Sequence, residues 1–273
     1  MLSIGLNNVG NTCYLNSALQ LLMANNDFCD VINKNNMMSE NLKTMSIFIN
    51  NYKSSKSSIT PNDVKNILTK KNKFVGNNQH DAGEFLTYLI DILNEDSKLQ
   101  IDKLFEVKVL STVKCKIRKC INISKNTENN NYLLFPIKNS DTTLDDCYRN
   151  FKSYEILDGD NMYDCNKCMK KVRASKRINI LNWSKHLIII LKRFNNNGNK
   201  NNQDIIIPLE WRHNYILKGV VIHSGGTNGG HYVYINKNIN GWTMCDDSNV
   251  YNISDEKAQL FLNKGYIFYY QQK

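Results

Sequence analysis

The chain has 273 residues, of which 41% are hydrophobic and 22% are charged, a composition typical of one large globular domain or two small ones. Its formal charge of +10 comes from lysines spread along the sequence, so a solvated surface explains the charge better than a nucleic-acid partner does. No window approaches the ~18 unbroken apolar residues of a membrane span, and we expect no membrane partner.

The first third of the chain is predicted to be helical. A helix is expected directly after residues 11–12, because apolar residues then recur at the spacing of one helix face. A second helix is expected to have Thr60 as its N-cap and Pro61 in its first position. A third follows Asp81, where the apolar residues of the stretch 81–93 again share one face.

After about residue 104 the pattern changes to that of strands. The strand-like stretches are 105–113, 132–137, 187–191, 220–222, 231–235 and 266–270. The run 187–191 is continuously apolar and suits a strand that is buried on both faces. Residues 195–202, almost all Asn, Gly and Lys, are expected to form a mobile surface loop. The sequence therefore predicts an α+β protein, with a helical N-terminal lobe facing an antiparallel β region across a groove.

The eight cysteines help to predict the cellular compartment of the protein. Residues 1–17 lack a basic stretch followed by an apolar one, so no signal peptide is visible. We expect an intracellular, reducing compartment, the cytoplasm or the nucleus, where cysteines serve as ligands, nucleophiles or core residues more often than as disulfides. Cys29, Cys147 and Cys245 lack ligand-like spacing and are interpreted as packing residues.

Cys13 is a candidate nucleophile because it lies at the predicted start of the first helix. Unpaired backbone N–H groups and the helix dipole favour a thiolate there and lower the pKa of the thiol. The alternative is a small buried residue near a helix start, which describes most single cysteines.

His231 is the candidate base. It follows the glycine-rich stretch 225–230, which leaves room for an extended peptide beside the imidazole. Asp246 or Asp247, on an antiparallel strand, can accept a hydrogen bond from Nδ1–H and leave Nε2 facing the thiol. Spacing does not separate the two acids, and His231 alone could be a core or loop histidine. Together the residues indicate a cysteine peptidase.

Two cysteine pairs have the spacing of metal ligands. Cys165 and Cys168 enclose two residues, and Cys115 and Cys120 enclose four. Two such pairs separated by a long insert can hold a tetrahedral zinc ion. The alternatives are a zinc-ribbon-like fold that has lost its metal, or cysteines that only occupy β-turns.

Five stretches of the chain, in order, resemble the signature segments of the ubiquitin-specific proteases, the USP family of deubiquitinases. They are the cysteine box 5–20, the glutamine-containing box 79–86, the strands 187–194 and 265–270, and the histidine box 229–234 with 242–250. The resemblance covers essentially the whole chain. It implies a papain-like cysteine peptidase with a helical thumb, an antiparallel β palm and zinc-ribbon fingers.

The resemblance also implies an activity and a set of catalytic residues. The activity is thiol-dependent hydrolysis of the isopeptide or peptide bond after the C-terminal glycine of ubiquitin. Cys13 is then the nucleophile, His231 the base and Asp246 its orienting acid, with Asp247 kept as an alternative. Asn8 occupies the position whose side-chain amide stabilises the oxyanion; otherwise it is a turn residue.

Four further residues are implied to bind substrate. Gln79, His80 and Asp81 would line a channel for the basic C-terminal tail of ubiquitin, and Tyr232 would pack beside the tail. Asp81 also fits a helix N-cap, and Tyr232 also fits a plain strand aromatic.

The implied architecture is a single catalytic domain over residues 1–273. The thumb would span about 1–97, the fingers about 105–185, and the palm about 186–273 with the strands bordering the fingers. Structural zinc would bind Cys115, Cys120, Cys165 and Cys168 at the tip of the fingers, although the first pair is longer than the family's usual spacing. We expect a monomer without accessory domains that needs no cofactor for catalysis.

Three other functions are open from the sequence. The chain could cleave a ubiquitin-like modifier such as SUMO or NEDD8, because specificity lies in surface contacts. An inactive ubiquitin-binding module would need a broken triad, and none of its members is missing. A zinc-dependent nucleic-acid binder would leave Cys13 and His231 unexplained.

Overall fold

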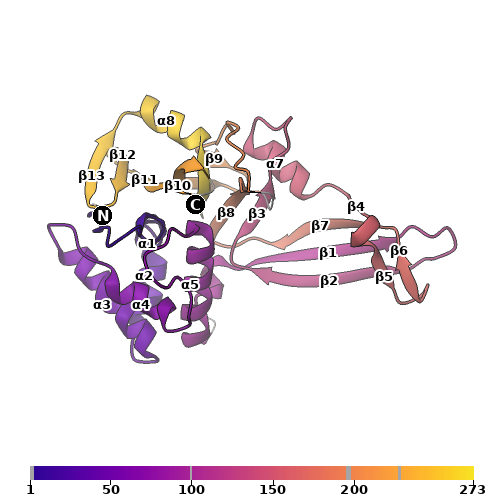
Figure 1. The fold of residues 1–273 in the computed structure, drawn as a ribbon, viewed down its shortest axis with the longest axis horizontal. Coiled ribbons are helices and arrows are strands. Elements are labelled where there is room, and N and C mark those ends of the chain that lie inside the picture. The colour runs from indigo at the N-terminus through magenta and orange to yellow at the C-terminus, as the bar shows by residue number, and fades with distance from the viewer. Residues whose placement is uncertain (1–2, 99, 195–197, 227–228) are drawn as a thin grey trace.

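Helices form one lobe of the molecule. The computed structural model describes residues 3–98, 100–194, 198–226 and 229–273. Within them the N-terminal lobe holds α1 (Cys13–Met23), α2 (Asn26–Lys34), α3 (Glu40–Ser54), α4 (Asn62–Thr69), α5 (Ala82–Asp96) and α6 (Asp102–Phe105) (Figure 1). Every residue of α1 is buried, because this helix packs against α5 on one side and against the large sheet on the other.

Two predicted helix starts had different outcomes. Asp81 caps α5 as predicted, since its side chain accepts a hydrogen bond from the backbone N–H of Glu84 at 2.9 Å. The predicted cap of α4 was wrong by one position: Pro61 precedes the helix instead of opening it. The hydroxyl of Thr60 does not cap the helix, because it accepts a hydrogen bond from the side chain of Asn7 at 3.0 Å.

The large sheet forms the second lobe. Its strands are β3 (Leu133–Pro136), β8 (His186–Lys192), β9 (Glu210–Trp211), β10 (Tyr215–Gly226), β11 (Gly229–Asn238), β12 (Gly241–Asp246), β13 (Asn249–Ile253) and β14 (Gly265–Gln272). They run in the order β13-β12-β11-β10-β14-β8-β3, with β9 paired to β10. The pairs are antiparallel as predicted, except that the short edge strand β3 runs parallel to β8.

Strand β8 is buried on both faces, as its apolar run predicts. Ile188 and Ile190 face the core shared with the N-terminal helices. Leu187, Ile189 and Leu191 face a second core, which α7 (Leu144–Phe151) and α8 (Asp255–Asn263) cover. The predicted packing cysteines are confirmed, since Cys29, Cys147 and Cys245 are buried free thiols.

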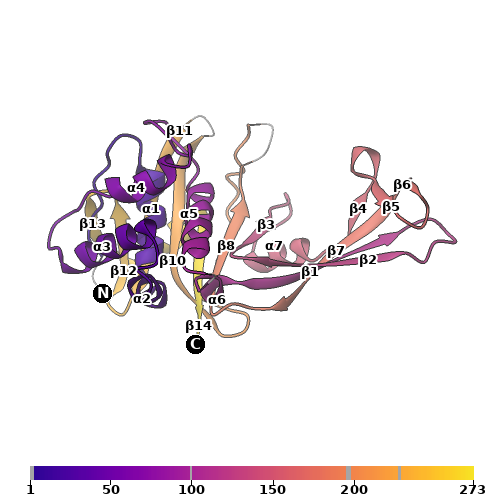
Figure 2. The same cartoon turned by 90° about the horizontal axis from the view of Figure 1, so that it is seen from below.

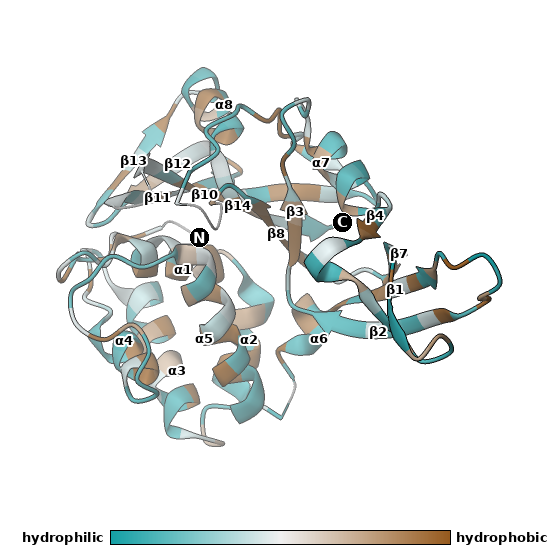
Figure 3. Cartoon of the chain, turned by 45° about the vertical axis from the view of Figure 1, so that its right-hand side comes forward, coloured by the Kyte–Doolittle hydropathy of each residue, from teal (hydrophilic) through white to brown (hydrophobic). Residues whose placement is uncertain are grey.

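A smaller sheet projects from the two lobes as a long ribbon (Figures 1 and 2). It contains β1 (Val107–Cys115), β2 (Ile123–Asn130), β4 (Glu155–Leu157) and β7 (Ala174–Asn182), in the order β2-β1-β7-β4. The short helix η1 (Gly159–Asn161) leads to the hairpin of β5 (Tyr163–Cys165) and β6 (Lys170–Val172) at its far end. Strand β2 is hydrophilic apart from Ile123 at its start, whereas β8 is mainly apolar (Figure 3).

The predicted loop 195–202 is tested only in part, because residues 195–197 lie outside the described residues. In the rest of the loop, Lys200 forms a bridge with Phe194, and its ammonium donates a hydrogen bond to the carbonyl of His223 at 2.7 Å. Across the described part of the chain, no helix combines the length and the apolar character needed to cross a membrane.

Arg193 fastens this loop to the large sheet although its side chain is almost fully buried. Its guanidinium donates to four backbone carbonyls, those of Asn201, Gln203, Asn263 and Gly265, at distances between 2.7 and 3.1 Å. We therefore expect Arg193→Met to lower the free energy of unfolding by about 3 kcal/mol or more, because it leaves buried acceptors without a donor. Urea unfolding would measure this loss. Lys192→Met, at the exposed last residue of β8 beside Arg193, is the control, and equal stability of the two variants would contradict the prediction.

Candidate active site

A cavity of about 490 Å³ lies where the helical lobe meets the large sheet. Cys13 lines it at the start of α1, together with the predicted substrate-binding residues of both lobes. These are Gln79, His80, Asp81 and Tyr232. The fold therefore brings the predicted nucleophile and all four predicted substrate-binding residues to one cavity, although more than 200 residues separate the ends of the set.

Cys13 opens α1 and His231 is on β11, and these two elements pack against each other. The backbone N–H of Tyr232, the residue that directly follows His231, lies close enough to the thiol of Cys13 to lower its pKa. Helix α1 packs against β11, so the contact is part of the main junction between the two lobes. The predicted nucleophile and base are thus neighbours in space.

The predicted lowering of the pKa of Cys13 was wrong for this state. The thiol is 3% exposed, and burial raises its pKa because a thiolate would lose its hydration. The backbone N–H groups of Tyr232, Tyr14 and Cys13 act in the expected direction and lower the pKa, but the net shift is upward. The charge of Asp247 raises it further. Cys13 is therefore a neutral thiol at pH 7 in this structure.

His231 is hydrogen-bonded to Asp246 through a different nitrogen from the one predicted. Its Nε2 lies 2.6 Å from Oδ1 of Asp246, across the antiparallel pair of β11 and β12. Nε2 is the ring nitrogen farther from the backbone, and it is the one that reaches an acid on the neighbouring strand. A neutral imidazole that donates from Nε2 keeps a lone pair on Nδ1, so Nδ1 is the nitrogen that can accept a proton.

Asp247 contacts a different set of residues. Its Oδ2 accepts a hydrogen bond from the side-chain amide of Asn8 at 2.8 Å, and its Oδ1 accepts one from Asn16 at 2.8 Å. Its φ of 50° starts the tight turn after β12, so its carboxylate leaves the strand in another direction from that of Asp246. The nearest ligand atoms of both acids and His231 still lie within 4.8 Å of one another.

Asn8 is held with its amide in one orientation. Its Oδ1 accepts hydrogen bonds from the backbone N–H groups of Gly10 and Thr12, both at 3.1 Å. The amide nitrogen therefore points to Asp247 and cannot exchange places with the oxygen without losing these bonds. Asn8 is exposed, so its second N–H remains available to a substrate.

Gln79 and Asp81 reach across the junction between the lobes. The amide of Gln79 makes two hydrogen bonds with the backbone of Gly230, at 3.0 and 2.8 Å. The carboxylate of Asp81 accepts from the hydroxyl of Tyr232 at 3.2 Å and from that of Tyr266 at 2.8 Å. Gln79 and Asp81 thus both line the cavity and hold its two walls together.

His80 and Tyr232 have mainly packing contacts. The ring of His80 contacts the rings of Tyr14 and Phe74, at centroid distances of 5.3 and 5.0 Å, and burial lowers its pKa. The ring of Tyr232 lies 4.4 Å from that of His223, which also lines the cavity. Burial lowers the pKa of His223 to about 4, so this imidazole is neutral at pH 7.

Sequence patterns missed three of the site's residues. Asn16 is one of three buried polar residues in α1, together with Ser17 and Gln20, and polar residues in so apolar a helix were the available signal. Tyr266 and His223 lie in apolar strands, where an aromatic residue suggests only packing. Residues 227–228 of the predicted glycine-rich loop lie outside the described residues.

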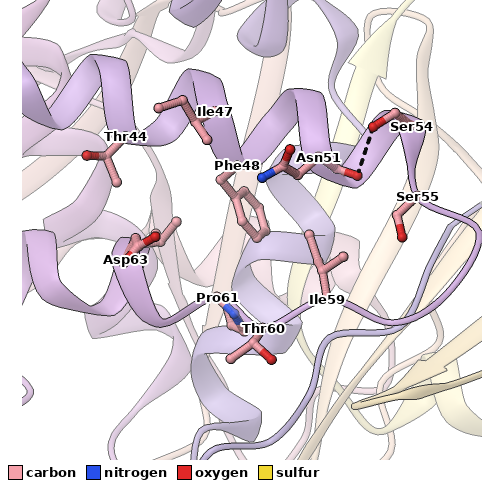
Figure 4. A pocket seen from close by; sticks show the side chains of 11 residues that line it. Thr44, Ile47, Phe48, Asn51, Ser54, Ser55, Ile59, Thr60, Pro61 and Asp63 are labelled. Carbon is pink, nitrogen blue, oxygen red and sulfur yellow. Dashed lines mark hydrogen bonds between the residues drawn. The ribbon is translucent and has the colours of Figure 1, made fainter.

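A second cavity, of about 540 Å³, lies between α3 and α4 (Figure 4). Its described lining consists of hydroxyl, amide and apolar side chains, the ring of Phe48 among them, with Asp63 as its one carboxylate and without cysteine or histidine. This composition offers no nucleophile and base, so we do not place the chemistry there.

The four predicted metal ligands meet at the end of the small sheet. The sulfur atoms of Cys115, Cys120, Cys165 and Cys168 all lie within 4.8 Å of one another. The Cys115–Cys168 and Cys120–Cys165 sulfur distances are 3.9 and 3.8 Å. A tetrahedral zinc ion with Zn–S bonds of about 2.3 Å separates its sulfur ligands by about 3.8 Å. Cluster and metal therefore fit, and the longer first pair does not disturb the geometry.

Comparison with known proteins assigns the chain to a family. The family model described as ubiquitin carboxyl-terminal hydrolase matches residues 4–270. The chain is 31% identical over 304 residues to ubiquitin carboxyl-terminal hydrolase 16 of Arabidopsis thaliana, covering 97% of this chain and 30% of the relative. It is 27% identical over 364 residues to ubiquitin carboxyl-terminal hydrolase 5 of Saccharomyces cerevisiae, covering 99% of this chain and 45% of the relative. The chain thus spans less than half the length of these relatives.

The raised pKa of Cys13 predicts a distinctive pH dependence. Because burial favours the neutral thiol, alkylation of Cys13 in the free protein should stay slow at pH 7. It should accelerate only above the ordinary thiol value of about 8.5. Labelling with iodoacetamide at a series of pH values, followed by peptide mass spectrometry, measures this rate. A rate that is already maximal near pH 6 would show a preformed thiolate and contradict the prediction.

Proposed function

The chain belongs to the ubiquitin carboxyl-terminal hydrolase family, and from this premise we propose that it is a cysteine-type deubiquitinase. It hydrolyses the isopeptide or peptide bond after the C-terminal glycine of ubiquitin. The observation that carries the proposal is the meeting of Cys13 with the strand of His231, whose imidazole is hydrogen-bonded to Asp246 at 2.6 Å. The cavity beside Cys13 is where the peptide would lie.

The proposed reaction begins with proton transfer from Cys13 to Nδ1 of His231. The sulfur then bonds to the carbonyl carbon of the terminal glycine, and the carbonyl oxygen takes the negative charge. When the C–N bond breaks, the imidazolium gives its proton to the leaving amine. His231 next deprotonates a water molecule, which hydrolyses the thioester to a carboxylate and restores the thiol.

We assign the two neighbouring acids different roles. Asp246 orients His231 and stabilises its protonated form, because it contacts the imidazole directly. Asp247 positions Asn8, because its carboxylate holds the amide nitrogen of Asn8. Asn8 then offers its free N–H to the developing oxyanion, and losing one such donor typically costs about 10²–10³ in rate.

Substrate binding is proposed to use the remaining residues of the cavity. Asp81 supplies a negative charge for the basic tail of ubiquitin, while Gln79 and Tyr232 contact the extended backbone. His80 lines the same channel, with its Nε2 buried and without a hydrogen-bond partner among the described residues. The alternative modifiers SUMO and NEDD8 would present a C-terminal glycine to the same chemistry.

The division of the chain is proposed in the family's terms. The helices up to about residue 97 form the thumb, residues of about 105–185 the fingers, and residues of about 186–273 the palm, with the strands bordering the fingers. The eight cysteines, all present as free thiols, support a reducing intracellular compartment, the cytoplasm or the nucleus. We propose that this catalytic domain acts as a monomer.

We propose that the four-cysteine cluster holds a structural zinc ion. Cys115, Cys120, Cys165 and Cys168 would be its ligands, and the ion would join the β1–β2 turn to the β5–β6 hairpin. The backbone N–H of Ile117 already donates to the sulfur of Cys115 at 3.4 Å, as expected for a thiolate ligand. The ion has no part in catalysis, because it lies at the far end of the fingers from Cys13 (Figure 2).

Ubiquitin bearing a C-terminal electrophile tests the proposed enzyme. The parent should form a covalent adduct, seen as a shift on a denaturing gel, and Cys13→Ala should form none. His231→Ala and Asn8→Ala should react more slowly, with kcat on a fluorogenic ubiquitin substrate about 10²–10³ lower for Asn8→Ala. Cys29→Ala, a buried thiol away from the cavity, is the control and should react like the parent.

Two results of that experiment would contradict the proposal. An adduct that survives in Cys13→Ala would place the nucleophile elsewhere. Faster labelling by the corresponding SUMO or NEDD8 probe would replace ubiquitin as the substrate while leaving the catalytic residues in place.

Metal analysis tests the zinc site. The purified protein should contain about one zinc ion per chain, and Cys165→Ser should lose it, because a closed tetrahedral site needs all four thiolates. Cys147→Ser removes a buried thiol outside the cluster and should keep the metal. Equal metal content in the two variants would rule out this ligand set.

A further inference from the structure

Eight lysines and arginines surround the four-cysteine cluster. They lie in two short stretches, 114–119 and 167–173, neither of which contains an acidic residue. All eight are exposed. Because the cysteines of both stretches meet within 4.8 Å, the fold gathers the eight cations at one end of the molecule. We call residues 114–123 and 165–173 the fingertip.

Few acids offset this charge. Among the described residues, the single ion pair of the fingertip joins Arg173 to Asp158 at 3.7 Å, and both partners are exposed. Asp160 and Asp164 are the other acids of the adjoining segment 158–164. The fingertip therefore carries a clear excess of positive charge, in contrast to the even spread expected from the sequence.

Aliphatic side chains of the fingertip are exposed as well. Ile121 is 80% exposed and Met169 is 86% exposed, and Ile117 and Ile123 are also exposed. Ile117 and Ile121 lie between β1 and β2, and Met169 lies between β5 and β6. These connections are at the far end of a ribbon that projects from the rest of the molecule (Figures 1 and 2). Exposed aliphatic residues at the end of a projection indicate a surface that binds an apolar partner.

We propose that the fingertip docks on an anionic lipid bilayer. Ile121 and Met169 would enter the boundary between headgroups and acyl chains, and the surrounding cations would meet the anionic headgroups. This one occupant accounts for both the positive charge and the projecting aliphatic residues. Peripheral docking revises the expectation of no membrane partner, which rested on the missing spanning segment alone.

Nucleic acid fits the fingertip less well. Phosphates would satisfy the cations, but bases stack on aromatic side chains, and Tyr163 is the one aromatic residue beside the cluster. Tyr163 is half-buried, and its hydroxyl accepts a hydrogen bond from Asn122 at 3.4 Å. Nucleic acid would also leave Ile121 and Met169 unexplained.

Docking at the fingertip would leave the catalytic cavity free. Strand β1 has nine residues, which at about 3.3 Å each separate the fingertip from the lobes by about 30 Å. A protein bound through this end would present Cys13 to substrates near the membrane. The docking itself does not depend on the proposed function, because vesicle binding is measured without a substrate.

Vesicle sedimentation with a charge-matched pair of variants tests the electrostatic part. The protein should sediment with vesicles of phosphatidylcholine containing about 30% phosphatidylserine, and not with phosphatidylcholine alone. Lys170→Glu with Lys171→Glu should weaken binding at least about 20-fold, since each lost cation costs about five-fold. Lys70→Glu with Lys71→Glu makes the same charge change on exposed residues of the thumb, and it should bind within about two-fold of the parent.

A second pair tests the apolar part. Ile121→Ser with Met169→Ser should weaken vesicle binding about ten-fold. Ile239→Ser, at a fully exposed position in the β11–β12 turn, should have no effect. Circular dichroism of each variant confirms that it is folded.

Three outcomes would overturn the proposal. The first is that the parent does not bind the anionic vesicles. The second is that the thumb pair weakens binding as much as the fingertip pair, which would make the attraction a property of total charge. The third is that the fingertip pair abolishes binding to a duplex DNA or single-stranded RNA oligonucleotide while vesicle binding is unchanged, which would assign the surface to nucleic acid.

Discussion

The carboxylate of Asp81 is the contact on which the geometry of the site depends. It caps α5 through the N–H of Glu84 and accepts hydrogen bonds from the hydroxyls of Tyr232 on β11 and Tyr266 on β14. Burial raises the pKa of both tyrosines, so each remains a hydrogen-bond donor at any physiological pH. One side chain of the helical lobe is therefore tied to two strands of the sheet. Tyr232 also follows His231, so this tie sets where the base stands relative to α1.

Local patterns predicted much of the fold because the interactions that form its elements are themselves local. The cap at Asp81 and the double-sided burial of β8 each follow from a few neighbouring residues. The site is different, because its contacts join distant parts of the chain. Gln79 and Gly230 are 151 positions apart, and no periodicity indicates that their amide groups pair. The choice of Nε2 over Nδ1 in His231 is likewise set by strand packing, which spacing does not encode.

The distribution of charge on the surface also depends on contacts between distant parts of the chain. Along the sequence the cations are spread out, and an even distribution predicts a solvated surface. Two hairpin turns, however, meet at the cysteine cluster and bring the stretches 114–119 and 167–173 together. A metal-ligand pattern predicted that meeting, but its consequence for the surface becomes visible only when the neighbours of the ligands are placed. Motifs that fix a fold can thus also create a surface with a separate use.

The adjacent acids Asp246 and Asp247 show why spacing could not assign their roles. Strand β12 ends at Asp246, whose carboxylate faces His231 on the neighbouring strand. The next residue enters the turn with φ of 50°, and its carboxylate faces Asn8 instead. The turn is also fixed to the segment before Asn8, because the N–H of Leu6 donates to the carbonyl of Asp247 at 2.8 Å. One turn therefore positions both the group that orients the base and the group that holds the oxyanion donor, so any shift of it would disturb both steps of the reaction together.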